Sequence, residues 1–191
     1  MKHRIFALAC TMVASLVIGC DSNGGGDPIP AECVVATDQE GPYPVKFQLT
    51  VAAEGTTMYI DWDCTPVVSL LTCDDGYTTA LAFDTACTAD CTAQPTECPI
   101  CGQCPGGPAA VTSAAPREFS WSGHTYDFGK NQAGCSCHEE KTAHAGKYRL
   151  TVPVYASEAD ANAHTNGVNR TVDFDLPAPN GIVNVQLDAA N

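Results

Sequence analysis

The chain has 191 residues, of which 22 are acidic and nine are Lys or Arg, so its formal net charge is −13 at pH 7. A chain of this length has room for one domain with a sizeable core. Because nucleic-acid affinity depends largely on cationic side chains that displace counterions, this charge argues against a nucleic-acid partner and is typical of an exposed, highly charged surface.

Residues 1–19 have the pattern of an export signal. Lys2 and Arg4 form a short basic region, and the apolar run over residues 5–18 is shorter than a membrane-spanning helix requires. The run ends in LVIGC, which closes with Cys20 and resembles the lipobox of bacterial lipoproteins. This resemblance implies cleavage before Cys20 and attachment of a lipid to its sulfur. We therefore expect a protein anchored by lipid in the bacterial cell envelope, periplasmic or surface-exposed.

Residues 20–32 are predicted to form a flexible linker, since they contain three consecutive glycines and two prolines among polar residues. The remaining residues, 33–191, are expected to form one domain. No other apolar run in the sequence is long enough to span a membrane. The lipid is therefore the membrane anchor that the sequence predicts.

The first strands of the domain follow the linker. Apolar residues alternate over residues 45–51 and 58–62, and the AEGTT segment at 53–57 between them is turn-like, which predicts a β-hairpin. Residues 66–83 are predicted to form a second pair of strands around the DDG turn at 74–76.

Residues 85–116 form a cysteine- and proline-rich insertion. After Cys10 leaves with the signal and Cys20 takes a lipid, the mature chain keeps ten cysteines, and an even number in an oxidising compartment predicts up to five disulfides with open connectivity. A bridge between Cys135 and Cys137 would be strained, so we expect these two to have different partners. The predicted half-cystines are Cys33, Cys64, Cys73, Cys87, Cys91, Cys98, Cys101, Cys104, Cys135 and Cys137.

The CPICGQC segment inside the insertion is open to more than one interpretation. Cys98, Cys101 and Cys104 match three of the four cysteines of a bacterial ferredoxin run, but Pro108 stands where the fourth would fall. A structural zinc site is a further alternative. Export to an oxidising compartment favours disulfides over both metal sites.

Three histidines after the insertion are candidate metal ligands. A strand is expected over residues 117–128, with a bend at Ser122 and Gly123, and this strand contains His124. His138 and His144 follow, and Glu139 and Glu140 lie beside them in the sequence. Imidazole and carboxylate groups together bind zinc or copper(II), although no HExxH spacing occurs and surface histidines in a polar loop are the simpler interpretation. CSCH at residues 135–138 is one residue short of a haem-attachment motif.

The C-terminal part of the chain supplies three more strands. Alternation predicts strands over residues 147–156, 170–176 and 182–187, and Pro153 indicates an edge or a bulge in the first of them. A short helix with a serine N-cap is expected over residues 157–164.

Seven or so short alternating strands predict an all-β fold, an antiparallel immunoglobulin-like β-sandwich. The succession of FQLTV, DDGYTTALAF, FSWSG and AGKYRLTV resembles the BsuPI-like domain, an immunoglobulin-like sandwich named for a bacterial intracellular proteinase inhibitor and found in exported proteins. The similarity spans most of residues 45–155. The chain departs from this domain in the insertion at 85–116 and in the long connection at 129–144, which we expect the cysteines to tie down.

The sequence contains no GxSxG elbow and no glycine-rich phosphate loop, so we expect a protein that is not an enzyme and needs no cofactor besides the lipid on Cys20. We expect a binding or structural module that contacts the membrane through its lipid and an envelope protein or glycan through its domain. One alternative is a metal-binding protein that uses His124, His138 and His144. The other, implied by the BsuPI-like resemblance, is a proteinase inhibitor whose insertion supplies a rigid extended loop.

The predicted export, cleavage and lipidation are testable on the purified mature protein. We expect intact-mass spectrometry to show a chain that begins at an acylated Cys20 and carries no alkylatable thiol, and elemental analysis to find no stoichiometric metal. An uncleaved, unacylated N-terminus with ten alkylatable thiols would overturn the assignment to an oxidising compartment.

Overall fold

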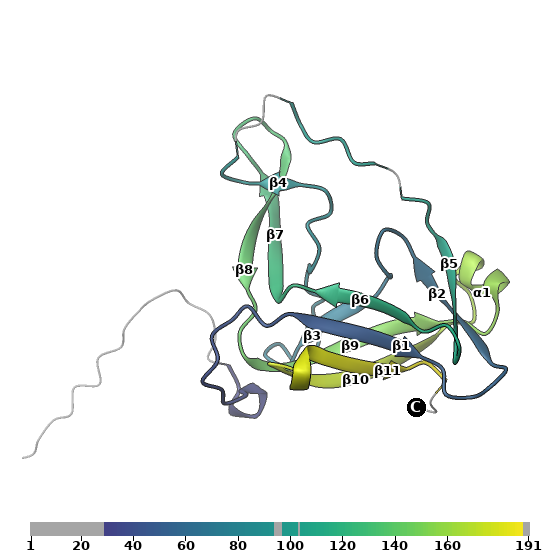
Figure 1. Ribbon diagram of the computed structural model, residues 1–191. Coiled ribbons are helices and arrows are strands. Elements are labelled where there is room, and N and C mark those ends of the chain that lie inside the picture. The colour runs from purple at the N-terminus through teal and green to yellow at the C-terminus, as the bar shows by residue number, and fades with distance from the viewer. Residues whose placement is uncertain (1–28, 94–96, 103, 189–191) are drawn as a thin grey trace, which may run out of the picture.

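The computed structural model describes residues 29–93, 97–102 and 104–188, so the signal, Cys20 and most of the linker lie outside the described residues. The fold is all-β, as predicted. Figure 1 shows a sandwich of two sheets from which an arm projects to one side. The strands are β1 (Val45–Thr50), β2 (Thr57–Trp62), β3 (Ser69–Thr72), β4 (Ala89–Asp90), β5 (Gly107–Thr112), β6 (Arg117–Trp121), β7 (His124–Lys130), β8 (Ser136–Thr142), β9 (Gly146–Val154), β10 (Val168–Leu176) and β11 (Ile182–Gln186).

The sandwich consists of two three-stranded sheets, with strand orders β11-β1-β6 and β10-β9-β3. Within the first sheet β1 pairs antiparallel with β6 but parallel with β11, so the sandwich is not purely antiparallel. The second sheet is antiparallel throughout. Each sheet turns the alternating apolar face of its strands inward, as the burial of every second residue along β1 and β9 shows.

Aromatic side chains join the two sheets across the core. Phe47 of β1 meets Phe174 of β10 edge to face, with ring centroids 5.4 Å apart, and also stacks on Phe119 of β6 at 4.8 Å. Trp121 of β6 contacts Tyr148 of β9 at 5.6 Å. Such pairs add roughly 0.5–1.5 kcal/mol each beyond the burial of their area.

One end of the sandwich is covered by the β2–β5 pair and by helix α1 (Glu158–Ala163). The predicted serine cap is confirmed, because Ser157 Oγ accepts a hydrogen bond from the Asp160 amide. Two 3-10 turns, η1 (Ala31–Cys33) and η2 (Pro179–Gly181), precede β1 and β11. None of the described helices is long and apolar enough to cross a membrane.

The arm is a separate three-stranded sheet of order β4-β8-β7. β7 and β8 form a long antiparallel hairpin, and β4 adds to β8 in parallel. The bend predicted at Ser122 and Gly123 is confirmed, and it turns the chain from the sandwich strand β6 into the arm strand β7.

The predicted hairpin of residues 45–51 and 58–62 is wrong in its pairing. Both strands exist, but β1 pairs with β6 and β11, whereas β2 pairs with β5. Alternation along the chain reports which face of a strand is buried, and it does not report which strand lies alongside. The second predicted pair, over residues 66–83, is reduced to β3 and one bridge between Leu71 and Ala80.

The three C-terminal strands and the short helix are confirmed. Pro153 lies in β9, the central strand of its sheet. β3 pairs with β9 only as far as Thr151, so at Pro153 the strand is paired with β10 and no longer with β3. Three strands were missed. β4 and β5 lie inside the range assigned to the insertion, and β8 lies inside the expected long connection, because none of the three has the regular apolar alternation that predicts a strand.

Gly123 provides a test of how the arm is joined to the sandwich. Its φ is +82°, and a Cβ there would lie 2.6 Å from the Tyr43 backbone nitrogen. Gly55 also has a positive φ, of +74°, but has open space around it. We expect Gly123→Ala to lower the free energy of unfolding by about 3 kcal/mol or more, and Gly55→Ala by only about 1 kcal/mol, in denaturant titrations with the disulfides intact. Equal losses would contradict this close approach.

Candidate functional site

The CPICGQC segment is bonded to three different parts of the molecule. Cys98 pairs with Cys135 at the tip of the arm, Cys101 pairs with Cys87 in the loop before β4, and Cys104 pairs with Cys64 after β2. The Cα–Cα distances of 5.2, 5.7 and 5.3 Å lie in the range that disulfides require. We call the described residues 97–102 the strut, because Figure 1 shows this segment running from the arm tip back toward β5.

The strut presents an apolar side chain to solvent. Ile100 is 93% exposed. The half-cystine Cys101 follows it directly, and Pro99 separates it from the half-cystine Cys98. The strut forms no helix, strand or backbone hydrogen bond with other described residues. Its backbone N–H and C=O groups are therefore available to a partner, while the two bridges limit its movement.

Two further bridges complete the framework. Cys91, just after β4, pairs with Cys137 of β8, and Cys33 of η1 pairs with Cys73 after β3. Cys135 and Cys137 thus have different partners, as predicted. Five disulfides indicate a chain that folds in an oxidising, non-cytoplasmic compartment.

The arm is held at its base by two aromatic residues of the sandwich core. The indole nitrogen of Trp121 donates to the backbone oxygen of His124, where β7 begins, at 2.6 Å. The Tyr148 hydroxyl donates to the backbone oxygen of His144, just after β8, at 2.9 Å. Burial raises the pKa of Tyr148, so this hydroxyl remains a donor at all physiological pH values. The orientation of the arm is therefore tied to the core.

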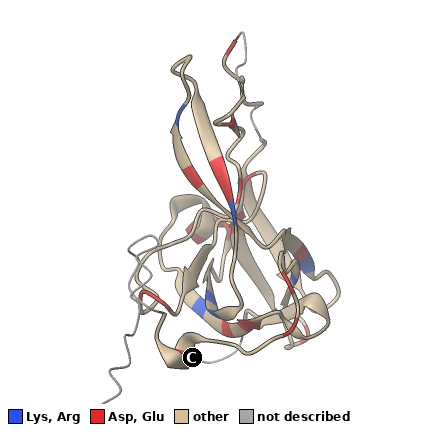
Figure 2. Ribbon diagram, turned by 90° about the vertical axis from the view of Figure 1, so that its left-hand side faces the viewer, with Lys and Arg blue, Asp and Glu red and all other residues tan. Residues whose placement is uncertain are grey.

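The two long strands of the arm carry three acidic residues and two lysines. Asp127 and Glu139 lie directly opposite each other on β7 and β8, and Glu140 follows, all exposed. Lys141 forms an ion pair with Asp127, which compensates part of this charge. Figure 2 shows acidic residues on both long strands of the arm.

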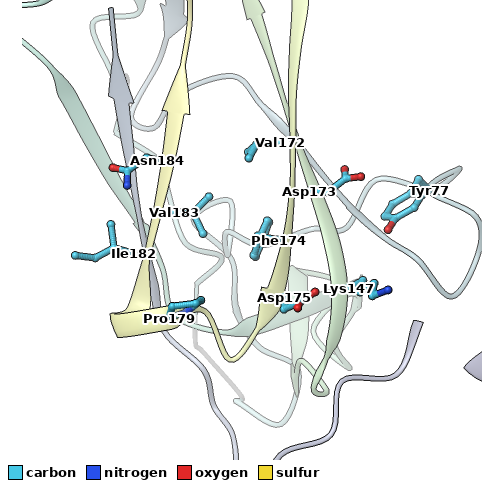
Figure 3. A pocket seen from close by; sticks show the side chains of 10 residues that line it. All are labelled: Tyr77, Lys147, Val172, Asp173, Phe174, Asp175, Pro179, Ile182, Val183 and Asn184. Carbon is cyan, nitrogen blue, oxygen red and sulfur yellow. The ribbon is translucent and has the colours of Figure 1, made fainter. Parts of the chain in front are cut away.

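A second candidate surface lies where the two sheets open between β10 and β11. This groove has a volume of about 770 Å³. Figure 3 shows Val172, Phe174 and Val183 directed into it from the two strands. Lys147 and Asp175, which are opposite each other in the β9–β10 register, lie along its rim. The groove thus combines an apolar floor with a rim of mixed charge.

The outer face beside the groove is neutralised by an ion pair. Arg149 binds both carboxylate oxygens of Asp173, at 2.6 and 2.8 Å, and stacks 4.1 Å from the ring centroid of Tyr77. The hydrogen bonds from Arg149 lower the pKa of Asp173. Burial, with a contribution from the Asp173 charge, raises the pKa of Tyr77. Asp173 is therefore ionised and already has a partner.

The three candidate metal-binding histidines each have a different partner. His124 Nδ1 lies 3.3 Å from Glu140, and His144 Nε2 lies 3.0 Å from Asp74. His138 Nδ1 lies 2.7 Å from the Thr88 hydroxyl. The register pairs His124 with Thr142, four residues from His138, which separates the two histidines by roughly 13 Å along the hairpin. The structure does not bring these histidines together.

Within the described part of the chain, one group of three metal-ligand atoms lies within 4.8 Å of one another, from Asp63, Cys64 and Cys104. The two sulfurs are bonded to each other. A disulfide has no thiolate to offer a metal, so this donor set does not fit a zinc or copper site.

Ile100 and the groove were not identified as site residues from the sequence. Ile100 stands between two cysteines of a segment that was singled out, but nothing in the sequence states that a particular apolar residue is exposed. The groove lies between β10 and β11, and the sequence did not show that these two strands lie near each other. Comparisons with protein-family models, with curated proteins and with solved structures found no match. The lipobox and BsuPI-like resemblances therefore stay predictions.

The bracing of the strut is testable by limited proteolysis. In a Cys98→Ala, Cys135→Ala double variant we expect cleavage within residues 97–102 to be at least about tenfold faster, because the strut loses its bond to the arm tip. The Cys33→Ala, Cys73→Ala variant removes a bridge outside the arm and should leave that rate unchanged. Equal cleavage in both variants, mapped by mass spectrometry, would contradict a local bracing role.

Proposed function

We propose that this protein is a lipid-anchored, non-catalytic binding module of the bacterial cell envelope, and that its strut contacts a partner protein. The observation that carries the proposal is the almost complete exposure of Ile100 between two half-cystines that are bonded to different segments. A large apolar side chain held in water on a covalently restrained segment offers apolar surface that a pocket of a partner would bury.

The strut fits a binding role for two physical reasons. An aliphatic side chain that enters a pocket removes apolar surface from water, and this makes such residues anchors of interfaces. A segment already restrained by disulfides also loses less conformational freedom when it binds. Both effects favour association without a rearrangement of the domain.

The direction of the arm supports the same proposal. Figure 1 places η1, the first described element of the chain, on one side of the sandwich and the arm on the other. A lipid on Cys20 would hold the chain at the membrane through residues 20–32. The strut would then face away from the anchoring membrane, toward proteins of the surrounding envelope.

Site-specific photocrosslinking in the envelope tests this proposal. We expect a photoreactive amino acid at position 100 to yield one discrete adduct with a partner protein, and the same group at Val168 to yield none. Val168 is a fitting control because it is an exposed aliphatic residue, 46% accessible, on the sandwich and not on the arm. The same adducts from both positions, or none from position 100, would refute a contact through the strut.

A second candidate function is proteinase inhibition. The specific observation that favours it is that the strut is exposed, lacks internal hydrogen bonds and is held by bridges on both sides of Ile100. Such a segment has the form that a proteinase cleft accepts, and a small apolar pocket of the elastase type would suit its side chain. The BsuPI-like resemblance points in the same direction.

Titration of an elastase-type serine proteinase with the mature protein distinguishes inhibition from general binding. An inhibitor would abolish the activity at about one equivalent and lose that effect in the Ile100→Asp variant. Rapid cleavage at the strut without loss of proteinase activity would rule out this second function and leave the first intact.

A further inference from the structure

The sandwich has four edge strands, and three of them are protected against pairing with another chain. β3 is covered, because the Leu81 amide donates to the Leu70 carbonyl at 2.7 Å and a bridge joins Leu71 to Ala80. β6 carries Arg117 and Glu118. Charged residues on an edge strand oppose the addition of a further strand.

β10 is protected in the same way. Asp173 and Asp175 lie on its outer face, and Arg170 donates to the Leu187 carbonyl at 2.8 Å, across the end of the groove. Charged side chains on an edge, including one directed inward, are devices that natural sheets use against association.

β11 differs from the other three edges. Its sequence, IVNVQ, contains no charged residue, no proline and no glycine, and three of its five residues are β-branched. Among the strands of the described residues, it pairs with β1 alone. On the other side lies the open groove, and Ile182 is 39% exposed. Figure 3 shows Ile182 and Asn184 directed away from the groove floor.

The backbone of β11 determines which groups face the open side. The Leu187 amide donates to Thr50 of β1, and the Val185 carbonyl accepts from the Thr50 hydroxyl, so odd-numbered residues face β1. By alternation, the N–H and C=O of Asn184, the N–H of Gln186 and the C=O of Ile182 point outward. The Ile182 amide is already used, because it donates to the Pro179 carbonyl.

These outward groups are self-complementary. We propose that two copies of this protein associate through β11, antiparallel about a two-fold axis that passes between the two Asn184 residues. In this register each Asn184 amide bonds to the Asn184 carbonyl of the other copy, and each Gln186 amide bonds to the other Ile182 carbonyl. The pairing forms about four hydrogen bonds and joins the two β11-β1-β6 sheets into one continuous sheet.

The same two-fold axis accounts for the groove. Since the axis is perpendicular to the sheet, Val183 of both copies stays on the inner face, and the two grooves meet. Their apolar floors, with Val172 and Phe174, are then covered. Asp173 and Asp175 approach the axis from the outer face of β10. Repulsion between these carboxylates of the two copies is reduced, because Asp173 is bound by Arg149 and Asp175 is opposite Lys147. The association is independent of the strut.

Cysteine crosslinking in the full-length exported protein tests the register directly. The facing Asn184 residues form a hydrogen-bonded pair, whose Cα atoms lie about 5.5 Å apart, within disulfide range. We expect Asn184→Cys to give a covalent dimer on a non-reducing gel. Thr171→Cys, on the exposed face of β10, should give none. Dimers from both variants, or from Thr171→Cys alone, would overturn the proposal.

Sedimentation of the mature lipidated protein in detergent provides a second measurement, which does not depend on an added thiol. We expect a monomer–dimer equilibrium whose dissociation constant rises at least about tenfold in Asn184→Lys, because two ammonium groups then face each other. Thr171→Lys adds the same charge to β10 and should leave the equilibrium unchanged. A monomer at every concentration, or equal weakening by both substitutions, would overturn the proposal.

Discussion

The three bonds that join Cys98, Cys101 and Cys104 to separate segments are the constraint on which the candidate site depends. The strut has neither the backbone pairing nor the burial that would otherwise fix its conformation. Ordering each residue of such a segment costs roughly 1–2 kcal/mol, and a disulfide lowers the free energy of the folded chain by about 2–4 kcal/mol relative to the unfolded one. Disulfides therefore restrain the conformation of the strut, whereas the packing of the hydrophobic core restrains the sandwich.

The sandwich supplies the rigid base that this arrangement needs. Its aromatic side chains pack the two sheets together. Trp121 and Tyr148 of this core also donate hydrogen bonds to the two chain segments at the base of the arm, where β7 begins and just after β8 ends. The arm and the open β11 edge lie on different parts of the molecule. A partner at the strut and a second copy at β11 would therefore occupy separate surfaces and would not compete with each other.

The sequence predicted what depends on local pattern and missed what depends on distant contacts. Alternation located β1, β9, β10 and β11, and the serine cap located α1, because these signals lie within a few residues. The partner of β1 could not be predicted, since β11 lies 135 residues away at the Thr50–Val185 contact. The number of cysteines predicted up to five bridges but not their pattern. The histidines near one another in sequence were separated because a hairpin strand rises about 3.3 Å per residue.

Peptide mapping of the unreduced protein by tandem mass spectrometry tests whether the CPICGQC segment is bonded to three separate segments. We expect Cys98, Cys101 and Cys104 to appear in crosslinked peptides with Cys135, Cys87 and Cys64, respectively. A bond between any two cysteines of the CPICGQC segment, or between Cys135 and Cys137, would contradict this connectivity, because the segment would then no longer be bonded to three separate parts of the fold.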